Sequence, residues 1–564
     1  MALLDWIVIA LFCVALIGII VWVMRQKQNN AADYFLGGKD ATWIAIGASI
    51  FASNIGSEHL IGLAGSGASS GMAMAHWEIQ GWMILILGWV FVPFYTRSMV
   101  YTMPEFLEKR FNPQSRTILA TISLISYVLT KVAVTVYAGG LVFQQVFGID
   151  ELWGIDFFWI AAVGLVLITA LYTIFGGMKS VLYTSVLQTP ILLLGSLIIL
   201  VLGLKELGGW DEMMRICSAV KVNEYGATKT NLIRNNGDPQ YPWLGALIGS
   251  AVIGFWYWCT DQFIVQRVLS GKNEKESRRG TIFGAYLKLL PVFLFLIPGM
   301  IAFALHQNLG DFLPLNANGM PNSDAAFPTL VAKLLPAGVK GLIVCGILAA
   351  LMSSLASLFN SSSALFTIDF YQRFKPNTDP KKLVKIGQAA TVVIVLLGIL
   401  WIPVMRSIGD VLYLYLQDVQ SVLAPGIASA FLIGILWKRA SAQGGMWALL
   451  SGLIVGLTRL GAKIYYTSQG VVAGANPDAS LFQRVFFDEN WLFFCGWMLV
   501  FCLAVGVIVS LCTKAPAPEK IQGLVFGTST AEQRAATRAS WDKWDIIHSI
   551  IILAITVAFY IYFW

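Results

Sequence analysis

The chain has 564 residues, of which 57% are apolar and only 12% are charged. Soluble globular proteins carry about 25% charged residues, and a soluble core stops growing at roughly 250–300 residues, so this composition excludes a soluble protein. The net charge of +7 does not indicate nucleic-acid binding, because the basic residues lie in short loops between apolar segments. We therefore expect an all-α polytopic membrane protein.

An apolar stretch of about 20 residues crosses the hydrocarbon core as a helix. The first stretch starts with Asp5 and has no small-residue cleavage site, so we interpret it as a span and not as a signal peptide. The connecting loops are ordinary polar segments, which predicts one transmembrane domain over residues 1–564. About fourteen spans are expected, at roughly 4–24, 42–66, 72–96, 117–145, 155–175, 181–204, 243–265, 281–305, 340–368, 384–405, 411–437, 444–463, 490–512 and 543–564.

The loop charges predict the orientation in the membrane. Lys and Arg accumulate in cytoplasmic loops, and most of the 38 basic residues fall on one side when the N-terminus is placed outside. We therefore expect a multi-pass protein of the cell membrane (plasma or inner membrane), with both termini on the outer side.

The second span contains Ser-Asn-Ile-Gly-Ser-Glu-His at 53–59. Unsatisfied backbone groups in hydrocarbon cost several kcal/mol, so a polar cluster at this depth marks a cavity or a helix contact. Three costly side chains coincide here with an expected helix break: Asn54, Glu58 and His59. This coincidence favours a binding site over a packing face.

The ninth span carries a second polar cluster, in which Ser353 and Ser354 are adjacent. Two hydroxyls, together with backbone carbonyls freed elsewhere, are what a small hard cation needs, and a site without a carboxylate suits an exchangeable ion such as sodium. Ser357 and residues 361–363 are interpreted as ordinary hydrogen-bonding contacts between helices.

Ionisable residues within spans are functional candidates, and Glu78 in the third span and Lys288 in the eighth are the clearest. Gln417 in the eleventh span and the aromatic run at 256–258 complete a set suited to a hydroxyl-rich ring: amides and carboxylates bind hydroxyls, and an aromatic face covers the C–H surface. Lys131 is interpreted as part of a structural ion pair or as a snorkelling group near a span end. A nucleophile elbow, a phosphate loop and metal-ligand spacing are missing from the sequence, so neither an enzyme nor a bound cofactor is predicted.

Six motifs distributed along the chain belong together: Ser-Asn-Ile-Gly-Ser-Glu-His at 53–59, Tyr-Thr-Met-Pro-Glu-Phe at 101–106, Ala-Leu-Tyr-Thr-Ile-Phe-Gly-Gly at 170–177, Trp-Tyr-Trp-Cys-Thr-Asp-Gln at 256–262, Ser-Ser-Leu-Ala-Ser at 353–357 and Phe-Thr-Ile-Asp at 366–369. As a set they resemble the sodium/solute symporter family, and most closely its sodium/glucose and sodium/myo-inositol cotransporter branch. The match runs from about residue 30 to residue 440.

The resemblance implies a five-plus-five inverted-repeat core of the LeuT type over about 42–437, with the first helix at 4–24 and the helices over about 444–564 at its periphery. The second to sixth spans would form one repeat and the seventh to eleventh the other. The first helix of each repeat is expected to be discontinuous.

The resemblance also implies the ligands. Sodium would be held by the backbone carbonyls of Ala52, Ile55 and Ala350 and the hydroxyls of Ser353 and Ser354. The sugar would be held by Asn54, His59, Glu78, Tyr257, Trp258, Lys288 and Gln417. Tyr257 would be the inner gate, beneath the sugar ring, and Tyr413 would close the outer side.

The activity implied is sodium-coupled import of a neutral sugar such as glucose or galactose by alternating access, with the sodium ion, the solute and the lipid bilayer as partners. Ser185 replaces an Asp found in many members, which favours one sodium per cycle over two. Gly254 stands where vertebrate glucose carriers have a side chain that can reach a sugar hydroxyl.

Several alternatives stay open from the sequence. Within the symporter hypothesis the solute could be myo-inositol or another polyol, favoured by the Gly-Ser-Glu-His form at 56–59, or an anion such as sialate or a monocarboxylate. A passive facilitator or channel is less favoured, because a selective pore would need filter carbonyls or charged rings. A membrane enzyme would need a nucleophile or metal group, and the sequence shows neither.

Overall fold

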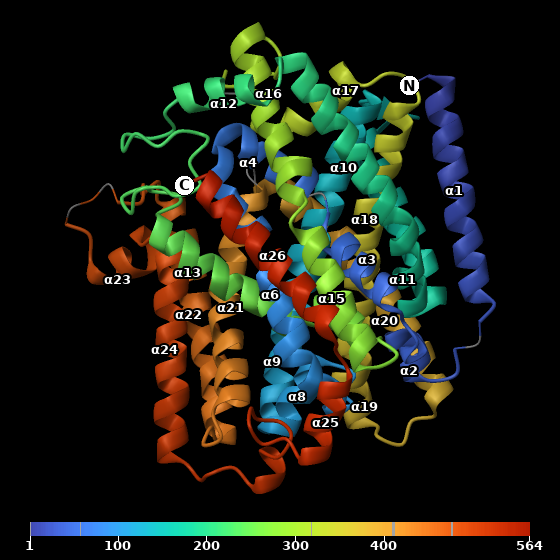
Figure 1. Ribbon diagram of the computed structural model, residues 1–564, viewed down its shortest axis with the longest axis vertical. Helices are drawn as coiled ribbons and strands as arrows, with labels where there is room; N and C mark the ends of the chain where they lie inside the picture. The colour runs from blue at the N-terminus through green and yellow to red at the C-terminus, as the bar shows by residue number, and fades with distance from the viewer. Residues whose placement is uncertain are drawn as a thin grey trace.

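The computed structural model describes residues 2–26, 28–56, 58–316, 319–408, 412–474, 476 and 478–564, without the side chains of 129, 141, 145, 404–408 and 412–416. Within these ranges, twelve helices are long and apolar enough to cross a membrane. They stand roughly upright and side by side in a helical bundle (Figure 1). The predicted all-α membrane fold is therefore confirmed.

The spanning segments contain, in chain order, α1 (Leu3–Met24), α3 (Trp43–Asn54), α4 (Ala64–Ser69), α5 (Ala75–Glu78), α6 (Gly81–Ile86), α7 (Val92–Ser98), α9 (Pro113–Ser126), α10 (Ala133–Phe147), α11 (Phe157–Leu207), α13 (Trp243–Gly254), α14 (Gln262–Leu269), α15 (Glu274–Lys288), α16 (Ile297–Leu309), α18 (Val339–Ala364), α20 (Pro380–Ile408), α21 (Leu412–Leu436), α22 (Ala442–Ser468), α24 (Trp491–Cys512) and α26 (Lys543–Tyr562). Wide π-type turns, which often mark functional sites, join several of them, at Glu58–Leu63, Leu87–Phe91, Tyr127–Val132, Phe255–Thr260, Val292–Leu296 and Leu365–Tyr371.

The connections carry short elements: α2 (Ala31–Leu36), α8 (Met103–Arg110), α12 (Trp210–Ala219), α17 (Ala326–Leu334), α19 (Gln372–Phe374), α23 (Leu481–Gln483), α25 (Ala531–Ala539), and the antiparallel strands β1 (Glu151–Leu152) and β2 (Ile155–Asp156). Polar caps fix several helix starts, since a side-chain oxygen satisfies a free backbone N–H there. Asn112 accepts from the N–H of Ser115 at the start of α9, and Asn273 accepts from that of Glu276 at the start of α15.

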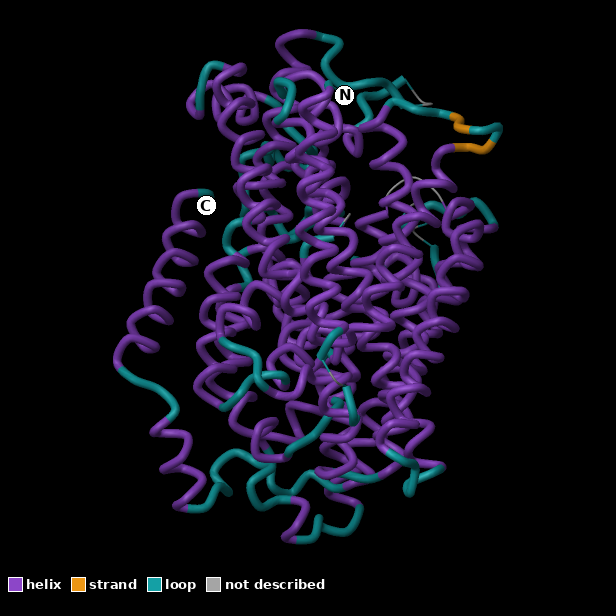
Figure 2. The backbone as a smooth tube through the Cα atoms, turned by 90° about the vertical axis from the view of Figure 1, so that its right-hand side faces the viewer, coloured by secondary structure: helices purple, strands orange, loops and turns teal. Residues whose placement is uncertain are grey.

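Helix α11 is two spans joined at Gly177. This residue has φ 53° and ψ −149°, and a Cβ atom there would lie 2.4 Å from the carbonyl oxygen of Tyr34, so only glycine fits. The strands before α11 and the helix α12 after it lie at the same end of the molecule (Figures 1 and 2), so the chain reverses between them. Counted this way, and with the interrupted α3–α4 segment as one span, the fourteen predicted spans are all found.

The first helix of each predicted repeat is broken. Helix α3 ends at Asn54, and Ile55 is extended at φ −82° and ψ 109°. The π-turn that follows α13 ends at Thr260, and Asp261 is likewise extended before α14 begins. These are the first helices of the two predicted repeats, so the predicted discontinuities are confirmed, and each break leaves backbone groups without helical partners.

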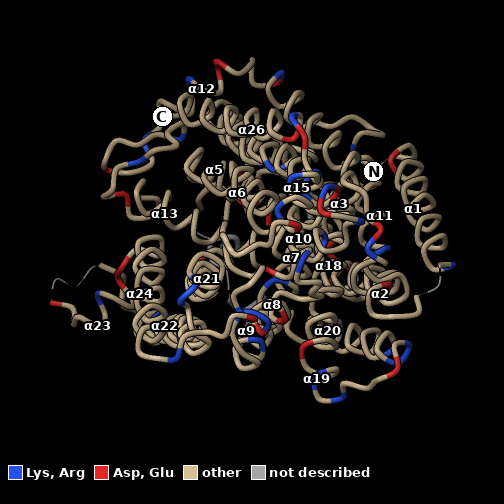
Figure 3. The backbone as a smooth tube through the Cα atoms, turned by 60° about the horizontal axis from the view of Figure 1, so that its bottom comes forward, with Lys and Arg blue, Asp and Glu red and all other residues tan. Residues whose placement is uncertain are grey.

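The peripheral helices pack outside this core. Helix α1 lies at one edge (Figure 1), where the Asp5 carboxylate accepts hydrogen bonds from the N–H groups of Gly338 (2.7 Å) and Gly341 (2.8 Å) at the start of α18. Lys and Arg residues gather around α8 and α9 and beyond α19 at the lower end of the molecule (Figure 3). Both termini lie in the upper half of Figure 1, away from this basic end.

Candidate ligand and ion site

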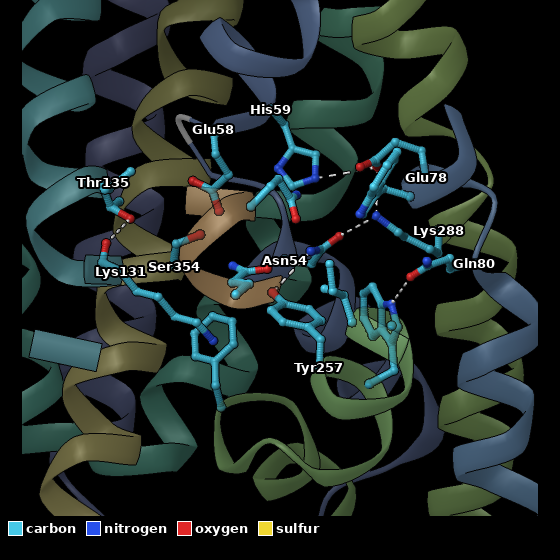
Figure 4. A pocket seen from close by; sticks show the side chains of 18 of the residues that line it. Asn54, Glu58, His59, Glu78, Gln80, Lys131, Thr135, Tyr257, Lys288 and Ser354 are labelled. Atoms are coloured by element: carbon cyan, nitrogen blue, oxygen red, sulfur yellow. Dashed lines mark hydrogen bonds and ion pairs between the residues drawn. The ribbon is translucent and has the colours of Figure 1, made fainter. Parts of the chain in front are cut away.

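A cavity lies where the two broken helices face each other (Figure 4), and about 670 Å³ within it is not filled by protein atoms. The space that the centre of a water molecule can reach is about 60 Å³, so the cavity is narrow. All seven predicted sugar-binding residues line it, together with the predicted sodium ligand Ser354. The lining residues are Asn54, Glu58, His59, Trp77, Glu78, Gln80, Lys131, Val134, Thr135, Ile253, Gly254, Tyr257, Trp258, Phe263, Lys288, Ser354, Leu358, Gln417 and Gln420.

One wall is built around the buried ion pair of Lys288 and Glu78. The Lys288 Nζ lies 2.7 Å from Glu78 Oε2 and donates a second hydrogen bond to Asn54 Oδ1 at 3.1 Å. Glu78 Oε2 also lies 3.5 Å from His59 Nε2. Lys288 is the last residue of α15, where a cation is favoured by the free carbonyls of the helix end. The arrangement holds two further predicted binding residues, Asn54 and His59, in fixed positions around a locally neutral pair.

Gln80 belongs to the same wall, and the sequence did not single it out. Its Nε2 donates to the carbonyl of Ser250 (2.7 Å), and its Oε1 accepts from Trp258 Nε1 (3.2 Å). Residues two apart point to different sides of a regular helix, yet Glu78 and Gln80 line the same cavity. They do so because α5 ends at Glu78 and α6 begins only at Gly81. The break leaves no periodicity signal in the sequence.

Gly254 makes room for Gln80. A Cβ atom at this position would lie 2.4 Å from Gln80 Oε1. The space that a side chain would occupy is therefore taken by the Gln80 amide, which approaches the same wall from a different helix.

The floor of the cavity is aromatic and holds a second buried ion pair. Asn54 Nδ2 donates to the Tyr257 hydroxyl at 3.2 Å, which links the end of α3 to the predicted inner gate. Lys131 Nζ lies 2.6 Å from Asp261 Oδ2, and Tyr127 donates to the other oxygen of this carboxylate. The ammonium lies 4.8 Å from the ring centre of Tyr257. Of the two roles predicted for Lys131, the structure shows the ion pair, and Lys131 also lines the cavity.

The predicted sodium ligands lie on α3 and α18. The Ser354 hydroxyl donates to the carbonyls of Ser53 (3.0 Å) and Ile55 (3.2 Å), so it reaches the carbonyls that the helix break frees. The Ser353 hydroxyl instead lies 3.3 Å from that of Ser185. The remaining predicted ligands, Ala52 and Ala350, are buried on the same two helices and do not line the cavity.

Four polar atoms of residues in the cavity wall have no hydrogen-bond partner among the residues that the structure describes: Glu58 Oε2, His59 Nδ1, Trp77 Nε1 and Gln417 Oε1. Buried polar groups are normally paired, so these atoms are positioned to bind something that enters. Tyr413, the predicted outer gate, has a side chain that lies outside the described residues.

Known proteins resemble this chain in sequence and in fold. The sequence model of the sodium:solute symporter family matches residues 34–452, which is well over half of the chain. The chain belongs to this family. The bovine (Bos taurus) sodium/myo-inositol cotransporter is 36% identical to this chain over 553 residues. The alignment covers 93% of this chain and 75% of the bovine protein.

Other relatives are similarly close to this family member. The mouse (Mus musculus) sodium/myo-inositol cotransporter 2 is 37% identical over 93% of this chain and 79% of its own. The zebrafish (Danio rerio) sodium/glucose cotransporter 4 is 36% identical over 96% and 83%. A solved Na⁺-coupled sialic acid symporter, in a substrate-bound outward-open state, superimposes with a TM-score of 0.72 over 91% of this chain and 99% of its own. At 23% identity this likeness shows the shared fold.

Proposed function

We propose that this protein is a sodium-coupled secondary active symporter that imports a neutral sugar or polyol, and that it has no enzymatic activity. The observation that carries the proposal is that Ser354, the hydroxyl beside the freed carbonyl of Ile55, lines the same narrow cavity as Glu78, Lys288 and Gln417. Sites for an ion and a solute that share one cavity can be coupled, because each affects whether the other binds.

A neutral, hydroxyl-rich solute suits the wall chemistry. The cation of Lys288 is held by Glu78 at 2.7 Å, so it is not available to compensate a carboxylate on the solute. Amide, imidazole and carboxylate atoms supply both donors and acceptors. The rings of Tyr257 and Trp258, whose centres lie 4.9 Å apart at an interplanar angle of 82°, offer apolar faces.

One sodium ion would bind between α3 and α18, held by the carbonyls of Ala52, Ile55 and Ala350 and the hydroxyls of Ser353 and Ser354. Oxygen ligands suit a hard cation, and the ion would take the place of the hydrogen bonds that Ser354 makes to the carbonyls. With Ser185 in place of an acid beside Ser353, we propose a stoichiometry of one.

Alternating access would use Tyr257 as the inner gate and Tyr413 as the outer closure. The hydrogen bond between Asn54 and Tyr257 connects the gate to the segment that supplies the carbonyl of Ile55. Loss of sodium would loosen this segment and release the tyrosine, so that ion and solute leave together. We place the single transmembrane domain in the cell membrane with the basic end inside and both termini outside.

The test is uptake of radiolabelled solutes into proteoliposomes with and without a sodium gradient, using glucose, galactose, myo-inositol and sialate. We expect sodium-dependent accumulation of a neutral solute. One sodium moving down about 100 mV provides roughly 2.3 kcal/mol, and a tenfold concentration ratio adds about 1.4 kcal/mol, so accumulation could reach roughly 500-fold. Equilibration without accumulation, whether or not sodium is present, would indicate a facilitator and refute the proposal.

A pair of variants separates the two sites. Ser354→Ala removes a sodium ligand and should weaken sodium dependence strongly, whereas Gln417→Ala should weaken solute affinity about 5- to 150-fold, the equivalent of one hydrogen bond at about 1–3 kcal/mol, and leave sodium binding intact. Equal loss of sodium binding in both variants would indicate misfolding instead of separate sites.

A further inference from the structure

The two carboxylates in the cavity wall have different surroundings. Glu78 is paired, because Lys288 and His59 both approach its Oε2 atom. Glu58 lines the same cavity, but within the described part of the chain its Oε2 is buried without a hydrogen-bond partner. Its carboxylate also has no cation within ion-pair distance among those residues, since Lys131 is held by Asp261 at 2.6 Å.

The backbone fixes where Glu58 points. The Oε2 atom lies close over Gly56, where a Cβ atom would come within 2.3 Å of it, so the carboxylate is folded back beside the break in the helix. In Figure 4 it points toward Ser354, on the other side of Asn54 from the Glu78–Lys288 pair. The cavity therefore has one acidic acceptor at each side.

A buried carboxylate oxygen left without a hydrogen-bond partner inside a membrane protein is costly, so a component of the bound state should donate to Glu58 Oε2. A hydroxylated ring fits better than a cation, because His59 Nδ1 and Gln417 Oε1 are unpaired in the same cavity. A ring that carries several hydroxyls offers hydrogen-bond donors to more than one of these atoms, whereas a metal cation offers no hydrogen-bond donor.

We infer that Glu58 is a specificity-determining residue that accepts hydrogen bonds from ring hydroxyls on the edge opposite to the one bound at Glu78 and Lys288, and so selects a cyclitol over an aldohexose. A six-carbon cyclitol such as myo-inositol carries a hydroxyl donor on every ring carbon. A pyranose has a ring oxygen that only accepts, and placing it against Glu58 would oppose two acceptors. This inference rests on the proposed function.

The experiment measures uptake in proteoliposomes at saturating sodium for myo-inositol and for a series of monodeoxy-inositols, each lacking one hydroxyl. In the unmodified protein, removal of one hydroxyl, or of either of two adjacent ones, should raise the half-saturating concentration about tenfold. Glu58→Gln, which keeps the shape and loses the charge, should raise the value for myo-inositol at least about fivefold, in line with the loss of one charge-assisted hydrogen bond. The same variant should no longer distinguish that deoxy analogue from myo-inositol.

Two further variants complete the design. Glu224→Gln removes an exposed carboxylate in the loop before α13 and should leave all these values unchanged. Glu58→Asp keeps the charge but withdraws the carboxylate by one methylene. It should also lower the ratio of half-saturating concentrations between the deoxy analogue and myo-inositol at least about fivefold. It serves as the test if Glu58→Gln does not fold.

The outcomes separate this inference from the proposed function. If the unmodified protein accumulates no sugar or polyol with sodium, the proposed function is wrong and the inference with it. If it accumulates myo-inositol while the folded Glu58 variant keeps the original affinity and discrimination, only the role of Glu58 is refuted. A loss of sodium affinity with unchanged solute affinity would likewise refute it, and would assign Glu58 to the ion.

Discussion

Replacement of Lys288 by methionine would remove the cationic half of a buried ion pair while keeping a side chain of similar length. The side chains of Lys288 and Glu78 are only 4% and 2% exposed, and their charged atoms are 2.7 Å apart. Breaking such a pair leaves an uncompensated charge, which costs about 3–5 kcal/mol. We expect Lys288→Met to lower the free energy of unfolding by about this amount, because among the described residues Glu78 would retain only its ion-pair contact with His59.

The double variant Glu78→Gln/Lys288→Met should recover most of this loss, because a buried pair replaced as a whole by neutral groups is often tolerated. Solute affinity should stay low in the double variant, since both binding groups are gone. The unfolding of the purified protein in detergent micelles, combined into a double-mutant cycle, measures the coupling between the two residues. Uptake in proteoliposomes measures the solute affinity separately.

The matched control is the pair of Arg215 and Glu212 on α12, whose charged atoms lie 2.6 Å apart, with the arginine side chain 68% exposed. Solvent screens such a pair, and exposed pairs contribute little to stability. Arg215→Met should therefore have no measurable effect on unfolding. The reasoning would be refuted if Lys288→Met and Arg215→Met destabilised the protein equally, or if the double variant were no more stable than Lys288→Met.

Three further predictions concern transport. Tyr257→Phe should retain solute binding with slowed, partly uncoupled uptake, because it loses only the hydrogen bond to Asn54. Tyr257→Ala should abolish accumulation. Coupled uptake at the original rate in the Ala variant would disprove the role of Tyr257 as the inner gate. The ratio of charge to solute flux, measured electrically with labelled solute, should be close to one, and a ratio near two would contradict the interpretation of Ser185. Gly254→Ala should displace Gln80 from Trp258 and weaken solute affinity about 5- to 150-fold, because one buried hydrogen bond is lost. Gly461→Ala is the control and should have no effect, because a Cβ atom there meets nothing within 4 Å.

The sequence by itself determined the class of fold and much of the site. Spans are long and apolar because lipid offers no hydrogen bonds, so composition alone identifies them. The same cost makes polar residues within spans conspicuous, which is why Asn54, His59, Glu78 and Lys288 were recognised and do line one cavity. The break after Asn54 was also visible, since small and polar residues gather there.

Only the tertiary structure decided how the polar residues divide between partners. In the sequence Glu58 and Glu78 look alike, since each is a glutamate within an apolar span. In the structure Lys288 from a distant helix neutralises Glu78, whereas Lys131 pairs with Asp261 and not with Glu58. Gln80 reaches the cavity because the helix is interrupted between residues 78 and 81, which no periodicity predicts. Pairing depends on distances of a few ångströms between side chains hundreds of residues apart, and the sequence does not contain those distances until the helices pack.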